Sequence, residues 1–301
     1  MIFIYSFLLF VFGIAIGSFA NVLTLRYQPE QNVFSKSVIG GRSHCMHCGK
    51  TLAWYELIPL FSFLIQGGRC RSCKALLTLQ YPLLEFFGGI ITLIVPLFLN
   101  AFYGVSNEFF FTLQLPWWYY GIVLAWVLVF LLFLVITVID LKHYIIPNEI
   151  NVILFVLGII LFALSFIDKS GVVLPFRDSF VRQYILLFSP VENPAVNRIA
   201  GMLVGGLFFW MLSAVTRGRG IGFGDVKLAF VAGLVFGWPD IALAIMLSFI
   251  VGGIWSAGLV VLGSKTMRDK VPFAPFFVVG ASLTFFFGYF IMKGYFSVFG
   301  L

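Results

Sequence analysis

The stretch that decides the fold is "WYYGIVLAWVLVFLLFLVITVID", residues 118–140. It carries no charge before its final aspartate, and about 20 apolar residues are enough to cross the hydrocarbon core of a bilayer as a helix. The whole chain has the same character, since 61% of its residues are hydrophobic, 10% are charged and the mean hydropathy is +1.06. Soluble domains carry roughly a quarter charged residues. The sequence therefore predicts an all-α polytopic membrane protein.

Apolar stretches of this kind recur along the chain and predict about eight transmembrane helices. They are residues 3–25, 82–99, 118–139, 150–167, 198–216, 226–239, 241–263 and 273–298. The first contains no charged residue, unlike a secretory signal with its basic n-region, so we expect a retained transmembrane helix within 1–27. The sixth is short and rich in glycine, and it ends at "WPD". No internal repeat is found.

Basic residues lie mainly in one set of connecting segments, about 26–81, 140–149, 217–227 and 264–272. Lys and Arg are enriched on the cytoplasmic side of membrane proteins, so we expect these segments in the cytoplasm and the N-terminus in the periplasm. The segment 168–197 is then the longest outer loop. Basic loops beside membrane spans also explain the net charge of +7. We therefore expect the lipid bilayer as a partner and do not expect nucleic acid. The basic residues of the cytoplasmic set are Arg26, Lys36, Arg42, Lys50, Arg69, Arg71, Lys74, Lys142, Arg217, Arg219, Lys227, Lys265, Arg268 and Lys270.

The polar segment 28–81 contains all four cysteines of the chain. Cys45 and Cys48 in "SHCMHCGK", and Cys70 and Cys73 in "GGRCRSC", form two C-x-x-C pairs. Each such turn aims two thiolates at one centre, so two of them complete a tetrahedral Zn²⁺ site. A pair of disulfides is the alternative, but the expected cytoplasmic location keeps thiols reduced. We therefore expect a small cytoplasmic zinc-knuckle domain with a structural metal.

Two aspartates stand at the cytoplasmic ends of expected spans. Asp140 ends the third span in "VITVIDLKHYIIPNEIN", and Asp225 opens the sixth in "GIGFGDVKL". Two carboxyl groups that face each other do not both ionise readily, so one can act as a base on water while the other polarises a peptide carbonyl. Gly222 and Gly224 lack a Cβ and let a strand-like substrate approach closely. Alternatively, Asp225 only caps its helix, and Asp140 pairs with Lys142.

Further motifs follow one another along the chain. In order, the motifs are "GSFANVLTLRY" (17–27), "HCMHC" with "RCRSC", "AWYELIP" (53–59), "YPLLE" (81–85), "IDLKHYIIPNEI" (139–150), "GIGFGDVKLA" (220–229) and "PFAPF" (272–276). Their sequences and their order resemble those of the type IV prepilin peptidase family of bacterial inner membranes. The chain resembles this family from about residue 14 to residue 285.

The resemblance implies a bifunctional enzyme and a membrane aspartyl protease of the G-x-G-D type. Such enzymes cleave the short basic leader from prepilins and pseudopilins on the cytoplasmic side. They then methylate the new N-terminal amine, commonly that of phenylalanine, with S-adenosylmethionine. Asp140 and Asp225 would be the catalytic pair. The implied domains are a first helix (1–27), a zinc-binding segment associated with methylation (28–81) and a transmembrane peptidase domain (82–301).

The chain departs from the family pattern at three places. Asn148 follows Pro147 where many relatives have Asp, which favours Asp140 as the first aspartate of the pair. Ala274 stands where glycine is usual, and "LLTLQYP" (76–82) is looser than the common "I-S-x-R-Y-P". The last departure lies close to the segment associated with methylation. A peptidase without methyltransferase activity is therefore one alternative.

Candidates for the methyl-transfer site are polar residues on the cytoplasmic side. Glu56 and Glu85 are acids suited to hold an amine or a ribose, and Asn21 and Arg26 lie at the mouth of the first span. Each has a structural alternative, in interfacial hydrogen bonding or positive-inside anchoring. Lys227, just inside the sixth span, is a candidate for the substrate cavity and a counter-ion for an aspartate, or its ammonium snorkels to the interface.

A transporter or membrane scaffold, with the zinc knuckle as a partner-binding module, is the alternative of another class. It would predict charged residues near mid-membrane, paired discontinuous helices and repeat symmetry. The sequence has one short glycine-rich helix and no repeat, which favours a peptidase acting on prepilins or pseudopilins. No particular oligomeric state follows from the sequence.

Overall fold

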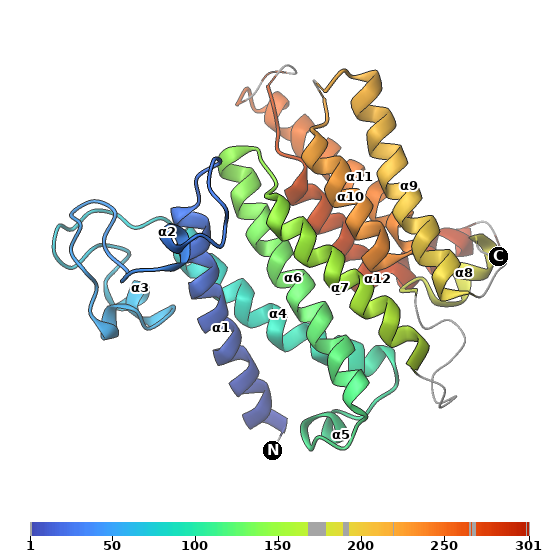
Figure 1. Ribbon diagram of the computed structural model, residues 1–301, viewed down its shortest axis with the longest axis horizontal. Helices are drawn as coiled ribbons and strands as arrows, with labels where there is room; N and C mark the ends of the chain where they lie inside the picture. Colours follow the sequence, from blue (N-terminus) through green and yellow to red (C-terminus); the bar gives the residue numbers. More distant parts are fainter. Residues whose placement is uncertain are drawn as a thin grey trace. The chain divides into compact units, whose positions relative to one another are not determined.

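The computed structural model describes residues 2–167, 179–188, 193–218, 220–264, 266, 269–298 and 300. Its regular elements in this part of the chain are all helices, and their order can be followed in Figure 1. They are α1 (Ile2–Arg26), α2 (Lys36–Ile39), η1 (Trp54–Glu56), α3 (Phe61–Ile65), α4 (Gln80–Phe102), α5 (Asn107–Phe111), α6 (Trp117–His143), α7 (Asn148–Ile167), η2 (Arg182–Tyr184), α8 (Ile185–Phe188), α9 (Pro194–Val215), α10 (Phe223–Phe236), α11 (Asp240–Val261) and α12 (Ala274–Val298). Much of the expected outer loop 168–197 lies outside the described residues, as do Arg219, Lys265 and Arg268.

Seven described helices have the length and apolar composition of a membrane span, namely α1, α4, α6, α7, α9, α11 and α12. Each coincides with an expected span, so the prediction of an all-helical polytopic membrane protein is confirmed. The four cysteines lie between its first two spans, also as predicted. The sixth expected span is the exception.

That sixth span, α10, is a helix of 14 residues. At 1.5 Å per residue it is about 21 Å long, shorter than the ~30 Å hydrocarbon core. It ends at Gly237, whose φ of +77° suits glycine, and Pro239 follows two residues later. The described part of the chain therefore holds seven full-length spans and one short, irregularly ended helix.

The chain forms two compact units, Met1–Val135 and Ile136–Leu301, and α6 continues from the first into the second. In the first unit, α1 packs on α4 through glycines. A Cβ on Gly13 would lie 2.5 Å from the carbonyl oxygen of Gly88, and a Cβ on Gly17 would collide with that of Leu84. Small residues of this kind let two helix backbones approach closely within a membrane.

In the second unit, α10 packs between α9 and α7. The contact with α9 is again made by small residues, since a Cβ on Gly201 would lie 2.6 Å from the carbonyl oxygen of Gly233. A Cβ on Gly205 would collide with the carbonyl oxygen of Ala229. Helix α10 is thus fixed by its neighbours despite its shortness, and so is Asp225 in its first turn.

The far end of α10, away from Asp225, is closed by buried charged residues. Arg198 donates to the carbonyl oxygens of Leu234 and Val235 at 2.9 and 2.8 Å. Asp240 is fully buried and accepts hydrogen bonds from Ser179 Oγ at 3.0 Å and from the backbone N–H of Phe180 at 2.9 Å. These bonds satisfy carbonyls at a helix end and a buried carboxyl, so we assign both charged residues a structural role.

Candidate functional site

Asp140 lies near the end of α6 and is buried, with 4% of its surface exposed. Its Oδ2 atom accepts a 3.0 Å hydrogen bond from the backbone N–H of Ala274, the first residue of α12. The first N–H groups of a helix have no partner within the helix and carry partial positive charge, so they suit a carboxylate. The start of α12 therefore holds Asp140 in place.

Asp225 lies in the first turn of α10 and is half-buried. Its Oδ2 atom accepts a hydrogen bond of 3.1 Å from the backbone N–H of Gly222, and its own N–H donates to the carbonyl oxygen of Gly222 at 3.1 Å. This reciprocal pair satisfies two backbone groups at the helix start. Asp225 therefore does cap its helix, and only its Oδ2 atom is used for the cap.

The two aspartates interact electrostatically. Burial raises the pKa of Asp225 to about 6, and the negative charge of Asp140 raises it as well, whereas the N–H of Gly222 lowers it. The second unit therefore brings the two carboxyls close enough to influence each other. Among the described residues, Asp140 and Lys142 form no ion pair, so the structure does not support that alternative role for Asp140.

Gly224 and Lys227 both connect the start of α10 to the chain that follows α6. A Cβ on Gly224 would lie 3.4 Å from Cβ of Ile146, so the missing side chain leaves room for this loop. The Nζ atom of Lys227 donates to Oδ1 of Asn148 at 2.8 Å and lies 5.1 Å from the centre of the Phe223 ring. In the described structure Lys227 forms no ion pair with either aspartate. Its contact with Asn148 was not foreseen from the sequence.

The four cysteines form one cluster in the first unit. Their sulfur atoms all lie within 4.8 Å of one another, and none of them forms a disulfide. A tetrahedron with metal–sulfur bonds of ~2.3 Å has sulfur–sulfur edges of about 3.8 Å, and the Sγ atoms of Cys45 and Cys73 are 3.9 Å apart. The donor set and its spacing therefore fit a four-thiolate metal site.

The two cysteine turns repeat one backbone arrangement. Each is closed by an isolated β-bridge, between His44 and Thr51 in the first turn and between residues 69 and 76 in the second. The fourth residue after the first cysteine has positive φ in both, +68° at Gly49 and +58° at Lys74. Such paired turns are typical of zinc knuckles, in which each turn supplies two thiolates.

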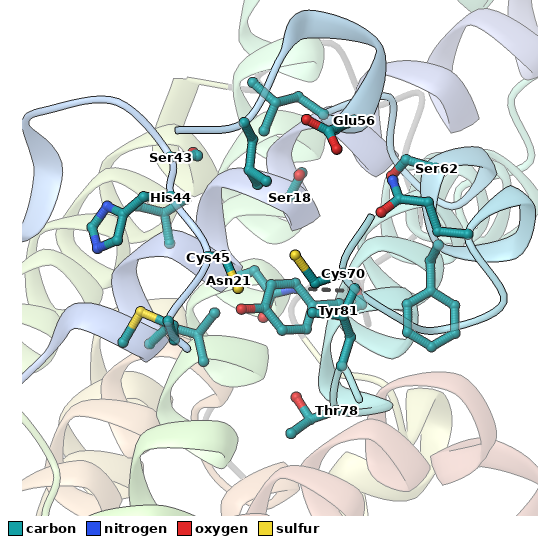
Figure 2. Close-up of a pocket in the computed structure, with 18 of the residues that line it drawn as sticks. Ser18, Asn21, Ser43, His44, Cys45, Glu56, Ser62, Cys70, Thr78 and Tyr81 are labelled. Atoms are coloured by element: carbon teal, nitrogen blue, oxygen red, sulfur yellow. Dashed lines mark hydrogen bonds between the residues drawn. The ribbon is translucent and has the colours of Figure 1, made fainter. Parts of the chain in front are cut away.

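The first unit also contains a cavity of about 350 Å³ beside the cysteine cluster. All four residues proposed from the sequence for methyl transfer line it: Asn21, Arg26, Glu56 and Glu85. In Figure 2, Asn21 and Tyr81 lie together in the middle of the view, with Glu56 above them. The fold thus gathers residues that are up to 64 positions apart in the sequence.

Asn21 and Arg26 have structural partners in this cavity. The side-chain amide of Asn21 donates to the carbonyl oxygen of Tyr81 at 3.1 Å and accepts from Gln80 at 3.0 Å, which ties α1 to α4. The guanidinium of Arg26 donates to backbone carbonyls of three residues within 38–42. Both residues therefore hold the walls of the cavity together.

Glu56 and Glu85 are buried carboxyls with 8% and 7% of their surface exposed. Oε2 of Glu56 accepts from the backbone N–H of Ala53 at 2.9 Å. Oε2 of Glu85 accepts from the N–H of Leu60 at 2.7 Å, and Ser18 also hydrogen-bonds to this carboxyl. Each acid is thus fixed by backbone while it lines the cavity.

Sequence reasoning missed several polar residues of this cavity, including Ser18, His44, Gln66 and Tyr81. Ser18 and Tyr81 belong to the motifs "GSFANVLTLRY" and "YPLLE", which was the available signal. Gln66 lies in the irregular segment between the cysteine turns, where no periodic pattern predicts which side chains face inward.

Comparison with known families matches the two parts of the chain separately. Residues 11–99 match the model of the bacterial peptidase A24 N-terminal domain, and residues 126–257 match the model of the type IV leader peptidase family. The first match lies within the unit that holds the cysteines and the cavity, and the second contains both aspartates.

Several curated proteins are similar to the chain over nearly its whole length, and each of those that follow is named prepilin leader peptidase/N-methyltransferase. The relative from Aeromonas salmonicida (strain A449) is 27% identical, with 98% of this chain and 94% of the relative covered. The one from Bacillus subtilis (strain 168) is 29% identical, with 96% of both covered. The one from Pseudomonas aeruginosa is 26% identical, with 94% and 90% covered. No solved structure matches the chain.

Proposed function

This chain belongs to the type IV leader peptidase family, and we propose that it cleaves the leader peptide of type IV prepilins or pseudopilins and methylates the new N-terminus. The observation that carries the peptidase part is the interaction between Asp140 and Asp225 at adjoining helix ends of one unit. The enzyme is a multi-pass protein of the inner membrane, with its N-terminus in the periplasm and its sites on the cytoplasmic side.

The two carboxyls divide the work of an acid–base peptide hydrolysis. The raised pKa of Asp225 makes it the proton-bearing member, which donates to the oxygen of the scissile carbonyl. Ionised Asp140 takes a proton from the water that attacks the carbonyl carbon. The tetrahedral intermediate collapses as the carbon–nitrogen bond breaks and the proton on Asp140 passes to the leaving amine. A hydroxyl proton of the intermediate returns to Asp225, which leaves a carboxylic acid product and both aspartates in their starting states. Each carboxyl keeps its Oδ2 on a backbone N–H, which fixes its orientation.

The substrate is expected to lie with its apolar helix in the bilayer and its basic leader in the cytoplasm. Gly222 is exposed, and a Cβ there would contact only its own Asp225 carboxyl and backbone of Gly224. Its surface is therefore the best place for a peptide backbone beside Asp225, whereas Gly224 serves chiefly the packing of Ile146. Lys227, two residues after Asp225 on α10, would lie beside the same peptide, and its hydrogen bond to Asn148 of α7 positions it.

The dyad is tested by replacing each aspartate in an in vitro prepilin cleavage assay. Asp140→Asn and Asp225→Asn keep the side-chain shape and remove the acid–base group, so cleavage is expected to fall by roughly 10²–10⁴-fold. Asp269→Asn, an exposed aspartate of the same unit, is the matched control and is expected to cleave normally. Near-normal cleavage by either dyad variant would contradict the assignment.

The metal and the methyl donor complete the proposal. Cys45, Cys48, Cys70 and Cys73 would hold a structural Zn²⁺, which stabilises a polar segment that has little apolar core of its own. S-adenosylmethionine would supply the methyl group. Incubation of the full chain with labelled donor and cleaved pilin tests this activity. Absence of label with intact cleavage would leave a peptidase without methyltransferase activity.

A further inference from the structure

Helix α3 of the first unit presents apolar side chains outward. Ser62 and Phe63 line the cavity beside the cysteine cluster. Phe61, Leu64 and Ile65 are instead 63%, 72% and 75% exposed. Residues three and four positions apart lie on one face of a helix, so the exposed three form a single apolar face. A helix at a water-exposed surface buries its apolar stripe against the protein, so the outer face of α3 requires an apolar partner.

The chain on either side of α3 repeats this exposure. Trp54 is the first residue of η1, and Leu76 and Leu79 lie in the segment that leads into α4; at least 68% of each side chain is exposed. Single exposed apolar side chains are normal on any protein surface. A group of six in one short segment outside the spans indicates contact with a membrane or with another protein.

Hydrogen bonds place the start of α3 at the depth of the bilayer. The N–H of Leu60, the residue before α3, donates to Glu85 at 2.7 Å, and Ser18 bonds to the same carboxyl. Glu85 lies roughly 8 Å inside the start of α4, and Ser18 roughly 12 Å before the end of α1, at about 1.5 Å per residue. These spans have 23 and 25 residues, so each end extends only a few Å beyond the ~30 Å hydrocarbon core. Accordingly, α3 lies below α2 in Figure 1, toward the N-terminal end of α1.

The charges of the same segment suit an acidic lipid surface. Between residues 40 and 79, every exposed charged side chain is basic, and the one acid, Glu56, is buried. The basic residues outnumber the negative charges of Glu56 and of a four-thiolate zinc centre. A second copy of the chain would present the same positive charge and be repelled, whereas acidic headgroups are attracted. The basic residues are Arg42, Lys50, Arg69, Arg71 and Lys74.

We propose that residues 54–79 form an interfacial membrane anchor whose partner is the lipid bilayer itself. The outer face of α3 lies among the acyl chains, as in amphipathic helices whose apolar face enters a bilayer by ~5–10 Å. Trp54 lies at the level of the headgroups, where tryptophan is enriched. The basic residues of the second cysteine turn, Arg69, Arg71 and Lys74, contact acidic headgroups. The segment expected in the cytoplasm is then partly embedded, whatever reaction the chain catalyses.

Lipid photolabelling of the wild-type chain tests the anchor without any substitution. The full chain, with its metal, is placed in nanodiscs that contain a phospholipid with a diazirine on its acyl chain. After irradiation the labelled peptides are mapped. The peptide that contains α3 is expected to be labelled to an extent comparable with α12, a span with exposed apolar side chains. Label on α12 but not on α3 would show that α3 faces water or another protein, and would overturn the proposal.

The headgroup contact is tested with the same diazirine on phosphatidylglycerol and on phosphatidylcholine. Relative to α12, the peptide of the second cysteine turn is expected to be labelled about fivefold more by the acidic probe. Salt at ~1 M screens such contacts and should remove the preference in wild type. The combined variant Arg69→Gln, Arg71→Gln and Lys74→Gln should also lose it, whereas Lys36→Gln, at an exposed position of α2, should keep it. Equal labelling of wild type by both probes at low salt would overturn the headgroup contact.

Discussion

The two units each hold a pair of carboxyls, but they hold them by different means. In the second unit, Asp140 and Asp225 are anchored on backbone N–H groups at the starts of α12 and α10, elements fixed by helix packing. In the first unit, Glu56 and Glu85 accept from loop backbone, and the cavity wall they share includes Cys45. One site is built by helices and the other depends on the cysteine turns, so different changes should disable them.

The largest effect is expected for Asp225→Asn, which should abolish cleavage while donor binding is retained. Cleavage should fall by roughly 10²–10⁴-fold because the proton donor is removed. Binding of S-adenosylmethionine to the same purified variant should stay within about twofold of wild type, since the residues proposed for methyl transfer all lie in the other unit. Cleavage assays and equilibrium dialysis on one preparation measure both. A parallel loss of binding would mean that the two sites are not independent.

Loss of the metal should instead impair donor binding. Cys70→Ser removes one of four thiolates and is expected to lower the zinc content. It is also expected to weaken donor binding more than tenfold, because Cys70 lines the same cavity as the residues proposed for methyl transfer. Ser72→Ala, which lies in the same turn but is outside the cysteine cluster, is the matched control. Metal analysis and dialysis give the two readouts. Donor binding that survives full loss of zinc would show that the cavity does not need the knuckles.

The pH dependence of cleavage should follow Asp225. Burial, and then the charge of Asp140, raises the pKa of Asp225 to about 6, so the proton that it donates is present below that pH and lost above it. The value of kcat/KM is therefore expected to fall about tenfold per pH unit above pH 6. Donor binding should show no such inflection from Asp225. A cleavage profile that is flat from pH 6 to pH 8 would contradict this role.

The same shift has a consequence for stability. Between the ordinary pKa of 3.8 and about 6, folded Asp225 keeps a proton that the unfolded chain has released. Stability from this group therefore falls as the pH rises through that window. Asn at position 225 does not ionise, so Asp225→Asn avoids this fall in stability. At pH 8 the Tm of the variant is therefore expected to equal or exceed that of wild type. This measurement also separates lost chemistry from lost folding.

The sequence was sufficient for what depends on local composition. Hydrophobic length located the spans, and the spacing of the cysteines predicted their cluster. The short length of α10 could also be predicted, because the helix ends at "GWP", residues 237–239. The aspartate pair rested on position at expected span ends and on motif order, and its catalytic role stays a prediction.

What depends on tertiary contact was less accessible. The contact of Lys227 with Asn148 joins residues 79 positions apart on different helices. The cavity is built largely from irregular chain between α1 and α4, where no period tells which side chains turn inward. Asn21 and Arg26 were chosen as polar residues near that site. In the structure the Asn21 amide bonds to the Tyr81 carbonyl and the Gln80 side chain, and the Arg26 guanidinium bonds to backbone carbonyls.

Lys227 provides a smaller test, confined to the second unit. Its ammonium is held by Asn148 and by the Phe223 ring, so Lys227→Met should lower stability by about 0.5–1.5 kcal/mol and leave the pH profile of cleavage in place. If Lys227 were instead a counter-ion of Asp225, its removal would raise the pKa of Asp225 and move the inflection of the cleavage profile to higher pH. Thermal denaturation and the cleavage profile of the same variant decide between the two.

The smallest effect concerns the two cysteine turns on which the first unit depends. Both require positive φ at the same position, and Gly49 adopts it freely while Lys74 adopts it with a side chain. Left-handed backbone costs a residue with a Cβ roughly 1 kcal/mol, so Lys74→Gly should relieve the second turn. Because metal binding is coupled to the folding of these turns, zinc affinity in a chelator competition should rise by about fivefold. Gly49→Ala makes the reverse change in the first turn and should lower the affinity by a similar factor. If both variants weakened zinc binding equally, the cation of Lys74 would matter more than its backbone, and the two turns would not be equivalent.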